Sequence, residues 1–177
     1  FSGERPRRWS PGASPRVISL GQNLIFNERV ATDPTGQVQI LLLDGSTFTV
    51  GPNSNLTIDE FVFDPNTGNA KVAASVTKGA FRFIGAKPSQ TPDGVAINSP
   101  VGTIGVRGGS VVCSFNAGGE MLCMMPFGKG VDITDASGQS CKLFKPGWLC
   151  AFDSNGNYIE TRKATPREIG MLAAALA

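Results

Sequence analysis

The sequence contains no histidine, and this absence removes whole classes of enzyme chemistry. Serine and cysteine nucleophiles that depend on an imidazole base are excluded, as are the common metal clusters built on histidine ligands. Carboxylate chemistry would have to use acids such as Asp44, Asp59, Glu60, Asp132 and Asp135. Each of these acids stands in a turn or at the expected edge of a strand. We therefore predict that the chain is not an enzyme and holds no metal and no cofactor.

Charged residues are scarce, at 17% of the chain, and no apolar run approaches the roughly 18 residues that span a bilayer. We therefore expect a chain that does not span a membrane. The formal net charge of +2 is uneven, because residues 1–16 hold four arginines against one glutamate while the rest is close to neutral. Nucleic-acid binders spread basic residues over a folded face, so we expect no nucleic-acid partner.

Glycine and proline are abundant instead, at 22 and 12 residues, and they separate short runs of β-forming residues from Val17 onward. Residues 38–43 and 47–50, for example, flank an Asp44-Gly45 dipeptide that is typical of a tight hairpin turn. The same pattern continues through Asn155-Gly156. It predicts an all-β body at residues 17–160. A β-solenoid and an irregular sandwich are the two alternatives, and the pattern alone does not separate them.

The stretch VAINSPVGTIGVRGGS at residues 95–110 alternates β-branched residues with glycines, which predicts strands that turn sharply in crowded surroundings. Its glycines could suggest a phosphate-binding loop, but such a loop leads into a helix. Here the β-forming run at residues 110–115 follows, so we expect structural turns. We interpret Arg107, inside this glycine frame, as a tie between adjacent loops, with a contact to an acidic partner as the alternative.

Four cysteines fall in the last third of the chain, namely Cys113, Cys123, Cys141 and Cys150. An even number suits two disulfides formed in an oxidising compartment. We favour Cys113–Cys123 and Cys141–Cys150, because each pair flanks a turn signal and would face each other across a hairpin. The alternative is four free buried thiols. Zinc is disfavoured because the chain has neither a CxxC pair nor a histidine.

Residues 1–16 are rich in proline and lack apolar periodicity, which predicts an extended arm. An arm with too few apolar groups for its own core needs a surface, either on its own domain or on a neighbouring subunit. The candidate contact residues in this arm are Arg5, Arg7, Arg8 and Trp9.

Residues 161–177 contain the one helix that the sequence predicts. Thr165 suits the N-cap, Pro166 the first helical position and Glu168 the third, and an apolar stripe follows them. A helix this short is marginal alone, so we expect its stripe to dock on its own domain or on a partner.

Four segments, in this order, resemble the FecR-type domain of bacterial extracytoplasmic proteins. They are NERVAT at residues 27–32, LLLDGSTFTVGP at 41–52, VTKGAFRF at 76–83 and SPVGTIGVRG at 99–108. The resemblance implies a β-solenoid-like, non-catalytic module outside the cytoplasm. In the best-known members this module belongs to a membrane regulator that controls an alternative sigma factor.

The resemblance and the composition together predict a stand-alone bacterial member that is secreted, on the cell surface or periplasmic. Removal of a signal peptide would explain why the chain starts at Phe1. Our main functional prediction is a protein–protein interaction module that associates with itself as a structural subunit. It would form a homo-oligomer or filament through the arm and the open β edges. The alternative is a periplasmic sensor or adaptor domain of a sigma-factor-type signalling system.

Overall fold

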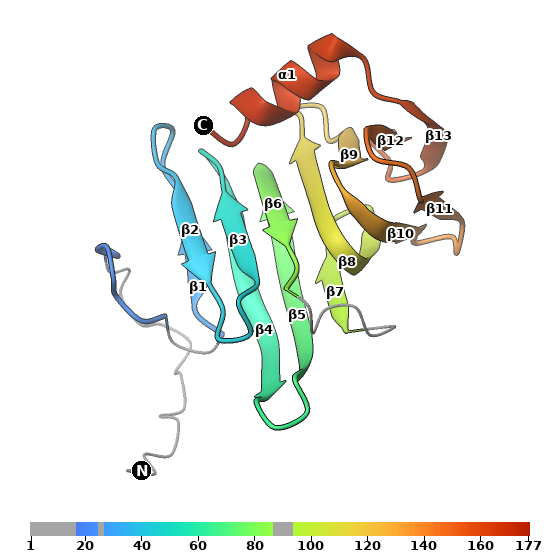
Figure 1. Ribbon diagram of the computed structural model, residues 1–177. Helices are drawn as coiled ribbons and strands as arrows, with labels where there is room; N and C mark the ends of the chain where they lie inside the picture. The colour runs from blue at the N-terminus through green and yellow to red at the C-terminus, as the bar shows by residue number, and fades with distance from the viewer. Residues whose placement is uncertain (1–16, 25–26, 87–93) are drawn as a thin grey trace.

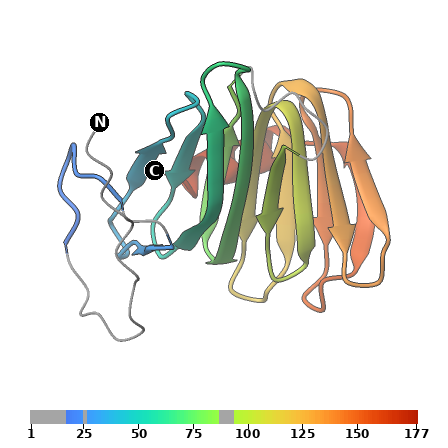
Figure 2. The same ribbon diagram turned by 90° about the horizontal axis from the view of Figure 1, so that it is seen from below.

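Strands with alternating buried and exposed side chains form two stacked layers, sheet A and sheet B (Figures 1 and 2). The architecture comes from a computed structural model, which describes residues 17–24, 27–86 and 94–177. Sheet A consists, in spatial order, of β1 (Arg29–Ala31), β4 (Asn55–Asp64), β5 (Asn69–Lys78), β7 (Val95–Asn98), the first half of β8 (Gly102–Phe115), β10 (Gly128–Asp135) and β11 (Ser140–Leu143).

Sheet B lies against sheet A and has the same number of members. Its spatial order is β2 (Val38–Leu41), β3 (Thr47–Val50), β6 (Ala80–Ile84), the second half of β8, β9 (Met121–Met125), β12 (Trp148–Phe152) and β13 (Tyr158–Lys163). In both layers the spatial order follows the order along the chain. The chain therefore advances from one end of the stack to the other, as the colours in Figure 2 show.

Strand β8 belongs to both layers and joins them. It pairs with β10 in sheet A up to Gly109, and with β6 in sheet B from Ser110 onward. The chain bends between these two partners, and Gly109 lies opposite Gly128 with positive φ at both residues. A Cβ at Gly109 would overlap the Cα of Gly128, so this crossing requires glycine. The stretch predicted to turn sharply at residues 95–110 contains this bend.

The main core lies between the two layers and draws on both of them. Sheet A contributes mainly β-branched residues such as Val72 and Ile104, whereas sheet B contributes aromatics. Phe48 and Phe83 are fully buried cross-strand neighbours whose ring centroids lie 4.8 Å apart. Burying such large apolar side chains is the dominant stabilising contribution to folding.

The helix α1 (Pro166–Ala174) covers part of the outer face of sheet B (Figure 1). Thr165 and Glu168 form the predicted capping box, and the predicted docking occurs on the chain's own domain. Leu172 and Leu176 are buried in a second apolar cluster with β8, β9 and β12, while Ile169 stays partly exposed. The helix starts later than residue 161 because residues 158–163 still pair with β12.

The all-β class with one short C-terminal helix is confirmed, but the solenoid character is not. All pairs of described strands are antiparallel except β5 with β7, and the sheet does not close on itself. The β pattern also begins later than predicted, since residues 17–24 are irregular and the first strand starts at Arg29. Among the described residues, no helix is long and apolar enough to cross a membrane.

Candidate functional site

Helix α1 packs on sheet B, and polar side chains form one continuous row across the outer face of sheet A. This row runs through all seven strands, because each member is the register partner of the next. Its members are Arg29, Thr57, Ser75, Asn98, Thr103, Thr134 and Ser140. They are half-buried or exposed, whereas Ile97, Ile104 and Ile133 in the neighbouring row are fully buried. The result is a polar surface that can form hydrogen bonds.

A second outward row beside it contains a shallow groove. Ala96, Gly105, Asp132 and Lys142 are successive register partners, and the small residues leave a depression of about 360 Å³. Arg107 also lines this groove and forms an ion pair of 2.8 Å with Asp132. The other carboxylate oxygen of Asp132 is buried and has no hydrogen-bond partner among the described residues. The groove therefore has basic side chains on its rim and a buried carboxylate oxygen beneath them.

The candidate carboxylates of the sequence do not form a catalytic pair. Asp44 accepts hydrogen bonds from Ser46, Asp59 from Ser75, and Asp132 pairs with Arg107 across the neighbouring strand. Glu60 pairs with Lys71, and Asp135 caps its own turn. Within the described ranges, no two of these five acids share a partner, and no cluster of three potential ligands could hold a metal ion.

The electrostatics of Asp135 also argue against a role as a general acid. Hydrogen bonds from the Ser137 side chain and from the backbone N–H groups of Gln139, Tyr158 and Ser137 lower the pKa of its carboxyl. A general acid at neutral pH needs a raised pKa instead. This carboxylate stabilises the turn after β10.

The cysteines gather in the core at the C-terminal end of the stack. Cys113, Cys123 and Cys150 are successive register partners in β8, β9 and β12 of sheet B. The structure pairs Cys113 with Cys123 and Cys141 with Cys150, which is the pairing favoured from the turn signals. The first disulfide joins neighbouring strands of a hairpin, as predicted. The second does not, because β11 and β12 are not paired; it crosses the core from β11 in sheet A to β12 in sheet B. All four residues are almost fully buried, so both disulfides serve the scaffold.

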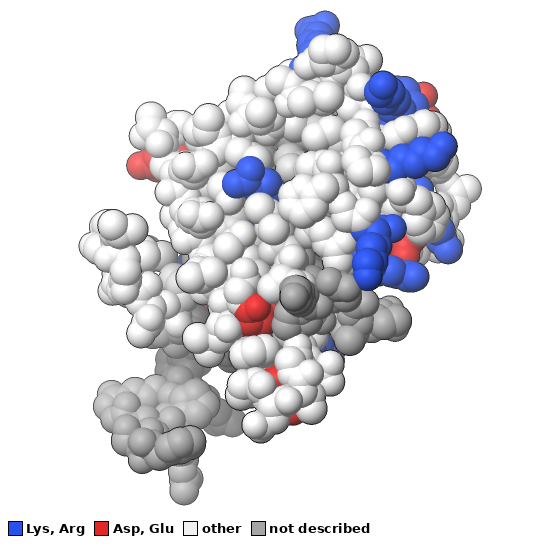
Figure 3. Space-filling model, viewed as in Figure 1, with Lys and Arg blue, Asp and Glu red and all other residues white. Residues whose placement is uncertain are grey.

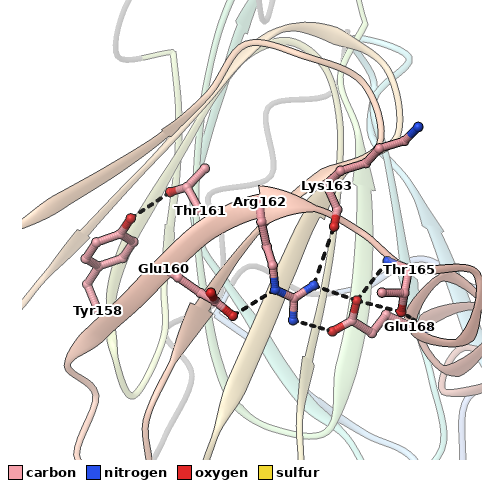
Figure 4. A network of polar contacts seen from close by, with 7 residues as sticks. All are labelled: Tyr158, Glu160, Thr161, Arg162, Lys163, Thr165 and Glu168. Carbon is pink, nitrogen blue, oxygen red and sulfur yellow. Dashed lines mark hydrogen bonds and ion pairs between the residues drawn. The ribbon is translucent and has the colours of Figure 1, made fainter.

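A polar network fixes α1 to the edge of sheet B (Figure 4). The guanidinium of Arg162 in β13 donates two hydrogen bonds to Glu168, of 2.7 and 2.8 Å, and one of 2.7 Å to Glu160. Glu168 also accepts from the backbone N–H of Thr165. The hydrogen bonds from Arg162 have the largest effect, and together with those from Thr165 they lower the pKa of Glu168 to about 2. The helix start is therefore held by a charged, bidentate contact at neutral pH.

The remaining predicted residues divide into two groups. Arg5, Arg7, Arg8 and Trp9 lie outside the described residues. Arg107 lies in strand β8 rather than in a loop, and it ties β8 to β10 through Asp132.

Sequence reasoning missed the polar row and the groove. Their members are far apart in the chain, and the signal that unites them is cross-strand register, which a single sequence does not display.

Comparisons with known proteins agree with this architecture. No curated protein sequence matches the chain. Two crystal structures of a candidate anti-sigma factor from Parabacteroides distasonis are similar in fold, each with a TM-score of 0.63 at 14% sequence identity. Each match covers 81% of this chain and 63% or 62% of the other, so the chain spans less than two thirds of that protein. The FecR protein family matches residues 28–123, more than half of the 177 residues. The chain belongs to the FecR protein family.

Proposed function

We propose that the chain is an extracytoplasmic sensor or adaptor in a sigma-factor-type signalling system. The observation that carries this proposal is the FecR family match over residues 28–123. The fold shared with a candidate anti-sigma factor supports it. The signalling role was our alternative prediction, and the family and the fold favour it over the main one, since neither supports a structural assembly subunit.

The chain would act by binding rather than by catalysis. The candidate acids are engaged in separate local structures, and the groove around Gly105 is too shallow to enclose a small substrate. The polar row and this groove form a polar surface of ordered strands, which suits a protein partner in the same pathway. Such regulatory contacts are polar and transient.

An oxidising location outside the cytoplasm fits both the family and the two disulfides. The serial stacking of strands supports the finer expectation of a solenoid-like body. In such a body each sheet ends in an open edge at either end of the stack.

Transcript sequencing after deletion of the gene in the source bacterium tests the signalling role. We expect altered expression of genes that share one alternative-sigma promoter, restored by the wild-type gene. The double variant Thr103→Lys with Thr134→Lys, which places two charges on the polar row, should not restore it. Ser154→Lys, equally exposed in the β12–β13 turn, should restore it and serves as the control.

Two outcomes would count against this proposal. If deletion changes no promoter class, the chain is not part of such a system. If the double variant restores expression as well as Ser154→Lys does, the outer face of sheet A is not the contact surface.

A further inference from the structure

Strand β2 is the last strand of sheet B at the N-terminal end of the stack, and its outer edge is open. Among the described residues it pairs with β3 only. The backbone N–H of Leu42 donates to Ser46 across the hairpin. Because N–H groups alternate in direction along a strand, those of Gln39 and Leu41 point away from β3. They are available to a further strand.

The sequence of this edge lacks the charges and prolines that protect many edge strands from pairing. Residues 38–43, VQILLL, contain no charge, no proline and no glycine. Leu41 and Leu43 project from the outer face and are 72% and 85% exposed. Exposed apolar strands of this kind are sites of intermolecular pairing.

The edges at the other end of the stack are protected. Strand β11 carries Lys142, while β13 carries Glu160, Arg162 and Lys163 and its pairing with β12 shifts in register. Figure 3 shows the same contrast on one face, where basic side chains gather over the C-terminal end. Charges and irregular pairing on an edge prevent a new strand from adding there.

The apolar exposure is also concentrated at the N-terminal end. The four most exposed large apolar residues in the described part of the chain are Val17, Leu20, Leu41 and Leu43. All four belong to residues 17–24 and 27–43, which lie at this end of the stack (Figures 1 and 2). In water, such a concentration favours association through this end.

We propose that two copies of the chain pair antiparallel through β2 and form a closed twofold dimer with a continuous sheet B. A twofold axis brings the same edge of each copy together, so the edge must complement itself. An uncharged edge meets this condition, because no like charges come face to face and Leu41 can meet Leu41 of the second copy. This dimer is independent of the proposed signalling role.

The protected edges decide between a dimer and a filament. A filament that continues the stack end to end would pair β2 of one copy with β11 or β13 of the next, because head-to-tail contacts propagate. The lysines and the register shift at that end oppose this contact. The structure therefore favours a discrete dimer over the filament that was one of our predictions from sequence.

Sedimentation equilibrium of the 177-residue chain over a wide range of concentrations tests the dimer. We expect wild type to follow a monomer–dimer equilibrium. Leu41→Lys should weaken dimerisation by about a hundredfold, because two leucines are lost per dimer and two charges meet. Ile159→Lys is the matched control, since Ile159 is also an exposed apolar residue of an edge strand, 55% exposed in β13. It should dimerise like wild type.

Circular dichroism and thermal unfolding of both variants show whether they fold. The proposal is overturned if wild type stays monomeric throughout, or if it forms assemblies that grow without limit. It is also overturned if folded Leu41→Lys dimerises as well as wild type, or if Ile159→Lys dissociates equally. As a further variant, Gln39→Pro removes one outward N–H and leaves the side of the strand that faces β3 intact. It should weaken the dimer too.

Discussion

The two ends of the stack are stabilised by different means. The N-terminal end depends on packing, with Phe48 and Phe83 in contact, no disulfide among its described residues, and leucines exposed at its edge. The C-terminal end has two disulfides, a docked helix and charged edges. The difference indicates a division of roles. One end is covalently fixed and protected from new contacts, whereas the other is left able to form them.

The strongest test of this contrast removes the packing at the N-terminal end. Phe48→Ala deletes a fully buried ring, and we expect it to lower the free energy of unfolding by about 3–5 kcal/mol. Urea unfolding followed by circular dichroism measures the change. Phe144→Ala, at an exposed aromatic of the other end, should change stability by less than about 1 kcal/mol. Equal effects of the two substitutions would contradict the contrast.

Removal of a disulfide tests the other end. Replacing both Cys141 and Cys150 with alanine should cost about 3 kcal/mol, since the bond closes a short loop and joins the two sheets. The pair Cys113 and Cys123 closes a loop of similar length and should cost about the same. Urea unfolding of each double variant, with its remaining disulfide kept oxidised, gives both changes in the free energy of unfolding. A cost below about 1 kcal/mol for each pair would mean that covalent links do not stabilise this end.

The contact between α1 and β13 should depend on pH. The pKa of Glu168 is lowered from 4.5 to about 2. The ionised carboxylate therefore stabilises the fold fully above pH 4.5, and this stabilisation disappears as the pH falls toward 2. At pH 7 we expect Glu168→Gln to lower the free energy of unfolding by about 1–2 kcal/mol. The effect is no larger because Arg162 is partly exposed and solvent screens the ion pair. The difference from wild type should shrink in urea unfolding between pH 4.5 and 2.5.

Glu160→Gln is the matched control for this pH dependence, because Glu160 contacts the same guanidinium but is more exposed. Its cost at pH 7 should stay within about 0.5 kcal/mol. If the two variants behave alike, the capping contact does not hold the helix in place.

The smallest effect is expected in the groove of sheet A, on the side of the C-terminal end. Arg107→Ala removes a half-exposed partner of Asp132 and should cost about 0.5–1 kcal/mol. Lys71→Ala, which breaks the more exposed pair with Glu60, should cost nearly nothing. Thermal unfolding at low and high salt distinguishes the two. A large loss for Arg107→Ala would make this residue part of the scaffold rather than of a binding surface.

Local features of the structure could be predicted from the sequence. The cap at Thr165, the turn at Asp44-Gly45 and the pairing of the cysteines each depend on residues that lie close together in the chain. Turn chemistry and capping act over a few residues, so a single sequence displays them.

Long-range features could not be predicted. The bend of β8 from one sheet to the other requires Gly109 and Gly128 to meet, and these residues are separated by a hairpin. The polar row depends in the same way on registers between strands from opposite ends of the chain. Nothing near each residue in the sequence specifies its partner, because registers are set by how whole faces pack.

The path of α1 has a consequence for the order in which the protein folds. The side-chain amide of Gln37 donates to the carbonyl of Leu176, and Gly51 lies directly against Ala175. Strands β2 and β3 are therefore completed by residues far away in the chain, since Gln37 and Leu176 are 139 positions apart. The same C-terminal segment also covers Leu149, Val112 and Met124. Closing a loop of this length costs more conformational entropy than closing a hairpin, so we expect these contacts to form late in folding.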